Sequence, residues 1–247
     1  MRAVEVAIDA ALVIMQNGGS TVAAERAFSS ILKRYGEEGV TAAWRLDFIV
    51  VTAAAEGGSS TFVREVGTTG MNLARASAAM VLADRLAEGN ISIADFPDDL
   101  ERIKNLPSAY KRWLTIAAAA CAGGFYSRTV GGDWGSLGIA FVAAGVGQSL
   151  RSLLQARKVA VVPLTLACAT VSALIAAAGL RIGFSNVEPA TLISSVIYMV
   201  PGLPLINGFI DMISHKHLLV GMQRMMNAAF LFLVLAIAIA FADSVVS

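Results

Sequence analysis

Charge is scarce in this chain of 247 residues. Only 15% of its residues are charged and 56% are hydrophobic, whereas an average soluble domain has about a quarter charged residues. This composition excludes a disordered chain, a collagen-like repeat and an ordinary cytosolic enzyme. The formal net charge of +1 also gives no reason to expect a nucleic-acid partner, which requires a basic surface to neutralise phosphates.

Residues that carry catalysis or bind cofactors are also scarce. The two cysteines, Cys121 and Cys168, lie in apolar runs outside any CxxC pair or His/Cys cluster, and we expect both to be buried hydrophobic residues. His215 and His217 have no third ligand nearby to complete a metal site. No GxxxxGK loop, HExxH motif or Ser/His/Asp arrangement is present. We therefore predict no catalytic residue, no metal, no cofactor and no enzymatic activity.

The charges that are present are unevenly distributed. Residues 1–112 contain 12 of the 19 Lys and Arg residues and 14 of the 18 Asp and Glu residues. The remaining 135 residues contain only 7 basic and 4 acidic residues. The sequence therefore divides into a polar front part and an apolar back part.

The first residues are apolar but do not resemble a signal peptide. Glu5 and Asp9 interrupt the segment that would form the hydrophobic region, and no convincing cleavage pattern follows. The apolar residues recur instead at helical spacing, at Val4, Ile8, Leu12 and Met15. We therefore expect an amphipathic helix that ends near residue 17.

Residues 1–107 are predicted to form a cytosolic α+β domain with the order αα-ββ-αα. Apolar residues at helical spacing indicate helices, with Gly36 as a C-terminal cap, and alternation of apolar and polar residues indicates strands. We expect Pro97 to interrupt the last short helix. The predicted helices cover residues 1–16, 21–35, 72–88 and about 92–104, and the predicted strands cover residues 40–52 and 61–66.

Residues 108–247 are predicted to form a transmembrane domain. A membrane span requires roughly 20 apolar residues, and five such segments follow one another with short connections: about 108–127, 134–154, 159–180, 191–210 and 222–241. Their many Gly and Ala residues favour close helix packing in lipid. The predicted fold class is therefore an α-helical polytopic membrane protein with five transmembrane helices, the fourth of them broken, and an N-terminal α+β cytosolic domain.

The loop charges predict an orientation. If the front domain is cytoplasmic, eight cationic residues lie on the inner side, namely Lys104, Lys111, Arg112, Arg151, Arg157, Lys158, Lys216 and Arg224, and only Arg128 and Arg181 lie on the outer side. Because cytoplasmic loops carry the excess of Lys and Arg, we expect a multi-pass protein of the bacterial inner membrane. Its N-terminal domain would be cytoplasmic and its C-terminus outside.

The fourth span is unusual because two prolines and two glycines fall within eight of its residues. Such a segment is not expected to form a regular helix, and unpaired backbone at membrane depth is tolerated where it lines a cavity. Broken helices of this kind form substrate and ion sites in transporters. We therefore predict a substrate-binding or translocation site made of Pro201, Gly202, Pro204, Asn207, Gly208 and Asp211.

Asp211 supports two interpretations. Its carboxylate could carry a proton or balance a substrate charge within the membrane. Alternatively, the prolines form a simple kink at a helix end, and Asp211 lies at the cytoplasmic boundary. The residue pattern alone does not decide between them.

The run from Val200 to Asp211, VPGLPLINGFID, resembles the signature of the threonine/serine exporter family. Weaker matches lie at Gly19-Ser20-Thr21-Val22 with Glu25, at Gly70-Met71-Asn72-Leu73, and at residues 110–113 before the first span. The resemblance covers nearly the whole chain. One departure is that Phe209-Ile210 stand where the family often has a charged residue.

The resemblance implies a secondary exporter of small polar metabolites. Larger members join two membrane halves, whereas a chain that ends after five spans resembles the larger subunit of the split form. The split form implies a second, small polytopic membrane subunit and export of dicarboxylates such as succinate, while the fused form exports threonine and serine. Five helices rich in small residues form a thin transporter, so a homo-oligomer in the lipid bilayer is also compatible with the sequence.

Three function classes are compared, and the third, a membrane-embedded enzyme, is disfavoured because no Ser/His/Asp arrangement, HExxH motif or paired-carboxylate spacing stands out. The leading hypothesis is an inner-membrane exporter subunit for a small-molecule amino acid or dicarboxylate, coupled to protons because the nucleotide-binding loop is missing. The alternative is a membrane-anchored regulatory or scaffold protein that acts through its cytosolic domain. A scaffold does not require a proline-broken intramembrane segment, and this feature favours the exporter.

Overall fold

The computed structural model describes residues 2–55, 58–67 and 70–246 and is mostly helical. The chain forms two compact units. The first contains residues 1–109 together with 202–226, and the second contains residues 110–201 and 227–247. The first unit therefore includes the predicted front domain and, in addition, a segment that belongs to the predicted fourth and fifth spans.

The first unit begins with two helices, α1 (Arg2–Gln16) and α2 (Thr21–Tyr35), as the sequence predicts. The Ser20 hydroxyl accepts a hydrogen bond from the backbone N–H of Ala23 at 3.2 Å and caps the start of α2. Gly36 ends α2 with a φ of 71°, the left-handed conformation that a glycine adopts without steric cost.

Three strands follow, not the predicted two. They are β1 (Val40–Trp44), β2 (Phe48–Ala55) and β3 (Gly58–Glu65), paired antiparallel in the order β1-β2-β3. The single strand predicted for residues 40–52 is wrong because the chain turns between Trp44 and Phe48, where the backbone N–H of Arg45 donates to the carbonyl of Phe48 at 3.0 Å. The apolar-polar alternation continues through this turn, which contains no Gly, Pro or Asn, so the pattern alone did not locate it.

Two more helices complete the N-terminal part, α3 (Leu73–Ala87) and α4 (Phe96–Lys104). Asn72 caps α3 through its side-chain oxygen. Pro97 lies in the first turn of α4, where its missing N–H costs nothing, and therefore begins this helix instead of interrupting it. Lys104 at the end of α4 pairs with Asp9 of α1 at 2.9 Å. Although burial opposes the charged amine, this pairing holds the pKa of Lys104 above its ordinary value.

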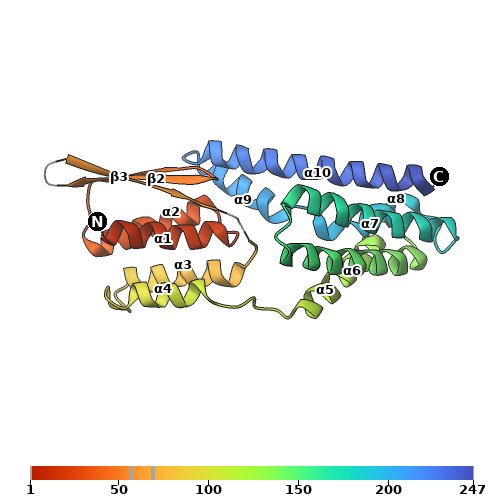
Figure 1. The fold of residues 1–247 in the computed structure, drawn as a ribbon, viewed down its shortest axis with the longest axis horizontal. Helices are drawn as coiled ribbons and strands as arrows, with labels where there is room; N and C mark the ends of the chain where they lie inside the picture. Colours follow the sequence, from red (N-terminus) through yellow and green to blue (C-terminus); the bar gives the residue numbers. More distant parts are fainter. Residues whose placement is uncertain (1, 56–57, 68–69, 247) are drawn as a thin grey trace. The chain divides into compact units, whose positions relative to one another are not determined.

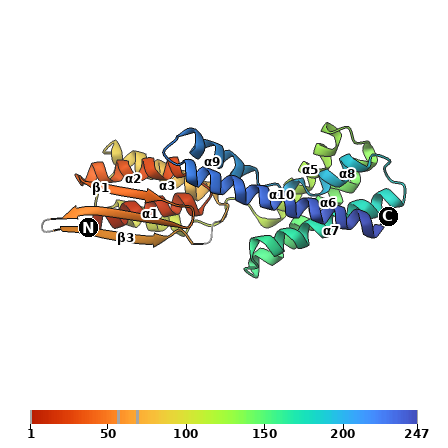
Figure 2. The same ribbon diagram turned by 90° about the horizontal axis from the view of Figure 1, so that it is seen from above.

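The hydrophobic core of the first unit lies between the sheet and the helices α1 to α4. Figure 1 shows the sheet over α1 and α2, with α3 and α4 on the other side of this helix pair, and Figure 2 shows the three strands side by side. The alternate residues Ile49, Val51 and Ala53 of β2 are buried, because one face of an antiparallel strand points into the core. The same core includes residues of all four helices, such as Ile8, Ile31, Leu86 and Phe96.

The second unit is a helical bundle. It contains α5 (Arg112–Thr129), α6 (Trp134–Ala156), α7 (Val161–Arg181), α8 (Glu188–Ser195), the short 3-10 helix η1 (Ile197–Met199) and the larger part of α10 (Leu218–Val246). Small residues allow close helix contacts, as predicted: a Cβ atom at Gly123 of α5 would lie 2.7 Å from the Cβ of Ala144 in α6.

Three helices among the described residues are long and apolar enough to cross a membrane: α6, α7 and residues 218–245 of α10. The pair formed by residues 188–199 and α9 (Gly202–Ile213) makes a fourth candidate if it is counted as one broken span. The first predicted span corresponds to α5, which is only 18 residues long and has an arginine in its first and last turns. The structure therefore supports three or four candidate spans, and the fifth stays a prediction.

Candidate functional site

The predicted break in the fourth span is located at Val200 and Pro201. The 3-10 helix η1 ends at Met199, and α9 begins at Gly202. Beyond this point the expectation of irregular backbone is wrong, because α9 is a regular helix of 12 residues. Pro204 lies in its first turn, where a helix needs no N–H donor.

Gly208 allows α9 and the start of α10 to pack closely as a helical hairpin. A Cβ atom on Gly221 of α10 would lie 2.7 Å from the carbonyl oxygen of Gly208 and 2.5 Å from Met212. A Cβ atom on Gly208 would meet Met225 at 3.1 Å. The two glycines therefore let the helices approach, and Gly208 has a packing function here.

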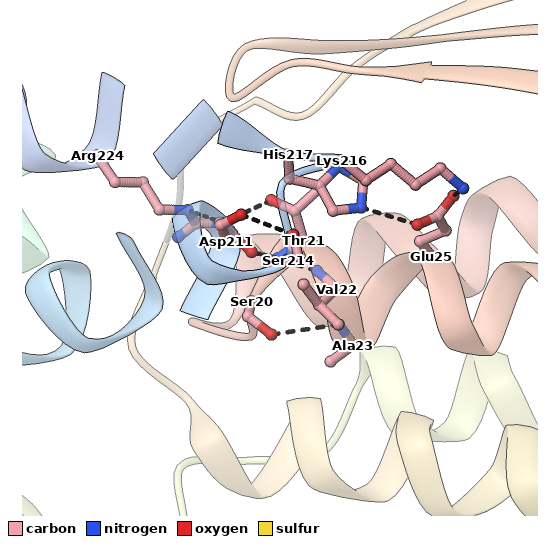
Figure 3. Close-up of polar contacts among 10 residues, drawn as sticks. All are labelled: Ser20, Thr21, Val22, Ala23, Glu25, Asp211, Ser214, Lys216, His217 and Arg224. Atoms are coloured by element: carbon pink, nitrogen blue, oxygen red, sulfur yellow. Dashed lines mark hydrogen bonds and ion pairs between the residues drawn. The ribbon is translucent and has the colours of Figure 1, made fainter. Parts of the chain in front are cut away.

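Asp211 is completely buried, and its carboxylate binds the start of α2 (Figure 3). Its Oδ1 accepts hydrogen bonds from the backbone N–H groups of Thr21 at 2.9 Å and Val22 at 3.3 Å. Its Oδ2 accepts a hydrogen bond from the Thr21 hydroxyl at 2.9 Å. Together with the Ser20 cap, Asp211 thus supplies acceptors to the first three N–H groups of α2, where the helix dipole favours negative charge.

Arg224 of α10 compensates the charge of Asp211. Its Nε lies 3.1 Å from Oδ2, an ion pair without hydrogen-bond geometry, and its side chain is only 9% exposed. A second guanidinium nitrogen donates to the carbonyl of Gly19 at 3.3 Å. The buried cation and anion therefore neutralise each other, as buried charges require.

Asn207 makes the third connection between the hairpin and the turn between α1 and α2. Its side-chain amide donates to the carbonyl of Gly18 at 2.8 Å. Gly18 has a φ of 94°, and a Cβ atom on Gly19 would lie 2.9 Å from the backbone oxygen of Ile14. This turn therefore requires its glycine pair. We call Gly18, Gly19, Thr21, Asn207, Asp211 and Arg224 the buried latch.

A second polar cluster joins the same two parts of the first unit. Glu25 of α2 pairs with Lys216 and, at 2.8 Å, with Nε2 of His217 (Figure 3). Although burial opposes the charged carboxylate, these two partners hold the pKa of Glu25 below its ordinary value. His217 is buried, contrary to the solvated position usual for a histidine near a helix end, and its ring lies edge-to-face against Trp44 at 6.3 Å.

The structure thus brings together only part of the predicted site. Asn207 and Asp211 share the buried latch, Gly208 packs beside it, and a Cβ atom on Gly202 would contact nothing within 4 Å. Asp211 lies beside the front part of the chain, as in the boundary interpretation, but it is buried and paired. Within the described ranges no group of three or more His, Cys, Asp or Glu side chains could hold a metal ion.

Sequence reasoning missed the partners of these residues. The sequence places Thr21 at a helix start and in a weak family match, and Arg224 among the inner-side cations, but it does not indicate that both contact Asp211. Arg224 was one of the few charged residues in an apolar segment, and such residues usually pair in the folded protein. The small number of charged residues in the apolar part of the chain was therefore the signal that could have indicated a partner for Arg224.

Comparison with known proteins decides the family. The model of the threonine/serine exporter family matches residues 5–246, nearly the whole chain. The chain belongs to the threonine/serine exporter family. The match includes both units and all of the buried latch, so the resemblance of residues 200–211 to this family is confirmed.

Two relatives align with this chain over almost their full length. "Probable succinate transporter subunit YjjP" of Klebsiella aerogenes is 26% identical over 242 residues, which cover 95% of this chain and 90% of the relative. The protein of the same name from Escherichia coli strain K12 is 25% identical over 242 residues, with 95% and 91% covered. This exporter family member is therefore similar to proteins named as transporter subunits.

A longer relative matches over part of its length. "Probable threonine/serine exporter" of Mycobacterium tuberculosis is 24% identical over 172 residues, which cover 69% of this chain and 32% of the relative. No solved structure matches the chain. The family and the apolar helices together identify a membrane protein of an exporter family.

Proposed function

We propose that the chain is one subunit of a secondary exporter in the bacterial inner membrane, with a small amino acid or a dicarboxylate such as succinate as its substrate. The single observation that carries this proposal is the helix break at Val200 and Pro201, followed by a helix that the buried latch ties to the turn between α1 and α2. Interrupted helices of this kind form the moving or substrate-lining elements of secondary transporters.

The proposed topology has five spans. The first is α5, which is short for a span but follows the aromatic residues Tyr110 and Trp113, both exposed and suited to a membrane interface. The excess of Lys and Arg on one side assigns α1 to α4 and the sheet to the cytoplasm and the C-terminus to the outside. A topology assay with reporters fused after residues 130 and 158 distinguishes this arrangement from one with three or four spans.

A partner subunit completes the exporter. Two relatives that align over almost their full length are each named as a transporter subunit. The bundle exposes many large apolar side chains, including Phe141 of α6 and Phe230 and Phe241 of α10. Such residues contact lipid, a second small membrane protein or another copy of the chain.

The buried latch supplies a mechanism for coupling to protons. Ionised Asp211 has two backbone N–H donors, one hydroxyl donor and one guanidinium partner. Protonation removes the negative charge that these groups stabilise and leaves Arg224 unpaired, so it weakens the attachment of α9 to α2. In this scheme Asp211 and Asn207 control the position of α9, and the substrate binds at another place on its route through the membrane.

Efflux of labelled solutes tests this function. Cells that produce the chain with its partner subunit are loaded with labelled succinate, threonine or serine, and the rate of loss is compared with that of cells lacking the chain. We expect faster loss of at least one solute. Asp211→Asn should abolish the gain, whereas the matched variant Asp98→Asn, at an exposed position of α4, should retain it.

Two outcomes contradict the proposal. Equal loss from cells with and without the chain, for all three solutes, contradicts the export function and favours a scaffold role of the N-terminal domain. Normal efflux from Asp211→Asn contradicts the assignment of a transport function to the buried latch.

A further inference from the structure

Among the described residues of the helical bundle, Arg151 of α6 combines burial with the lack of an anionic partner. Arg151 is the only charged residue of α6, and it lies just over one turn from the C-terminal end of that helix. Its side chain is partly buried, and its Nε is completely buried. A cation in such a position is energetically costly, and cations within membrane spans usually face a partner or a pathway.

No carboxylate neutralises this guanidinium in the part of the chain that the structure describes. Its Nη1 donates to the backbone carbonyl of Tyr198 at 3.3 Å, and its buried Nε has no hydrogen-bond acceptor among the described residues. Arg224, by contrast, pairs with Asp211. A neutral carbonyl supplies one acceptor but no charge, so Arg151 retains the capacity to bind an anion.

Tyr198, whose carbonyl accepts from Arg151, is closely packed against α6 and α7. The Tyr198 hydroxyl lies 3.1 Å from the Ser172 hydroxyl, and 3.4 Å from the carbonyl oxygen of Cys168. Gly147 is one helical turn before Arg151, and a Cβ atom there would lie 2.0 Å from the Tyr198 hydroxyl oxygen. Only a glycine therefore admits the tyrosine at this place, and the tyrosine in turn presents its carbonyl to Arg151.

Tyr198 also connects this cluster to the broken segment. It is the middle residue of η1, which ends one residue before the non-helical Val200 and Pro201. Apolar residues of the bundle, among them Leu154, Leu164 and Val196, form a hydrophobic cluster that also includes Tyr198. An anion that reaches Arg151 therefore meets a cation in an apolar setting, where charge pairing is stronger than in water.

We infer that Arg151 binds a carboxylate group of the transported solute, an assignment that rests on the proposed export function. A guanidinium presents a planar pair of N–H donors that matches the two oxygens of a carboxylate. Succinate, threonine and serine share this group, so the same residue serves either substrate class. Arg151 is then the substrate-binding cation, and Tyr198 positions it through its backbone carbonyl.

Inhibition by acid and amide analogues tests this assignment. Transport of labelled succinate and labelled threonine is measured with the full chain and its partner subunit in vesicles of neutral phosphatidylcholine, with unlabelled succinate, succinamide, threonine and threoninamide as competitors. We expect the acid of the transported solute to compete with wild-type transport at least 10-fold better than its amide, because only the acid pairs with the guanidinium.

Three variants complete the design. Arg151→Gln should raise the KM by about 10- to 100-fold and bring acid and amide competitors to similar potency. Arg151→Lys keeps the charge without the paired donors and should give an intermediate KM. Arg157→Gln, which removes an exposed arginine at the end of the same helix, is the matched control and should leave the acid preference unchanged.

The outcomes separate this inference from the proposed function. If wild-type vesicles transport and Arg151→Gln retains the acid preference, the inference is overturned and the export function stands. If Arg151→Gln and Arg157→Gln weaken transport equally, or if the effect of Arg151→Gln appears only in vesicles with anionic lipid, Arg151 binds headgroups and the inference is likewise overturned. If wild-type vesicles transport none of the solutes, the export function itself fails.

Discussion

Arg224 of the first unit is buried and Arg151 of the second unit is partly buried, and the two arginines differ in their partners. Arg224 in the first unit lies 3.1 Å from a carboxylate that also binds the start of a helix. Arg151 in the second unit has a single backbone carbonyl as its acceptor. Removing one partner of a buried ion pair leaves the other charge uncompensated and costs stability, whereas removing an unpaired cation leaves no such charge behind. The first unit therefore uses its arginine for attachment, and the second has one available for a ligand.

The largest expected effect concerns the arginines themselves. Arg224→Leu leaves Asp211 buried without its counterion and should lower the free energy of unfolding by about 3–5 kcal/mol. Arg151→Leu removes an unpaired cation and should leave the stability unchanged or raise it. Thermal unfolding of the purified full chain in detergent measures both variants. A similar loss of stability for both would show that Arg151 is a structural residue and would remove the distinction between the units.

The next effect tests the packing of the hairpin that carries the buried latch. Gly221→Ala would place a Cβ atom 2.7 Å from the backbone oxygen of Gly208, and separating the helices should cost about 1–3 kcal/mol. Gly202→Ala, in the first turn of α9, meets nothing within 4 Å and is the matched control. Hydrogen exchange at the N–H groups of Thr21 and Val22 should become faster in the first variant only. Unchanged exchange in Gly221→Ala would contradict the dependence of the latch on this close approach.

The smallest effect is a pH dependence at the second cluster. Because the pKa of Glu25 is lowered in the folded state by Lys216 and His217, its ionised form contributes stability above the unfolded-state pKa. That contribution is lost as the pH falls through the lowered folded-state value. Glu25→Gln should therefore flatten the acid side of the stability profile, with a change at neutral pH of about 1 kcal/mol or less for this partly exposed group.

The control for that measurement is Glu38→Gln, at an exposed position after α2. Its profile should follow the wild type throughout the acid range. If Glu25→Gln also follows the wild type, the contacts of Glu25 with Lys216 and His217 do not contribute to the attachment of the hairpin.

Much of the fold could be predicted because its signals are local. The helix starting at Thr21 has a serine cap before it and a glycine after it, and such features act within a few residues. The turn between β1 and β2 was missed because it has no Gly, Pro or Asn, and its one turn-favouring residue, Asp47, fits the apolar-polar alternation of the strand pattern. Pro97 was misinterpreted because proline is compatible with the first turn of a helix and incompatible with its interior.

The site was less predictable because its partners are distant in the sequence. Asp211 and Asn207 stood out as polar residues in an apolar segment, but Thr21 and Gly18 precede them by about 190 residues. Helical periodicity and capping preferences carry no information over such a distance. Arg151 was counted with the inner-side cations for the same reason: a cation near the end of a span usually indicates orientation, and its lack of a partner is visible only in three dimensions.

In the proposed mechanism, the Asp211–Arg224 pair forms and breaks during proton-coupled export. The most direct test imposes a pH gradient on vesicles that contain the chain with its partner subunit and compares gradient-driven transport with exchange of labelled for unlabelled solute in the absence of a gradient. The account predicts that the gradient accelerates transport by the wild type and has no effect on Asp211→Asn. An equal response to the gradient in both proteins would contradict it.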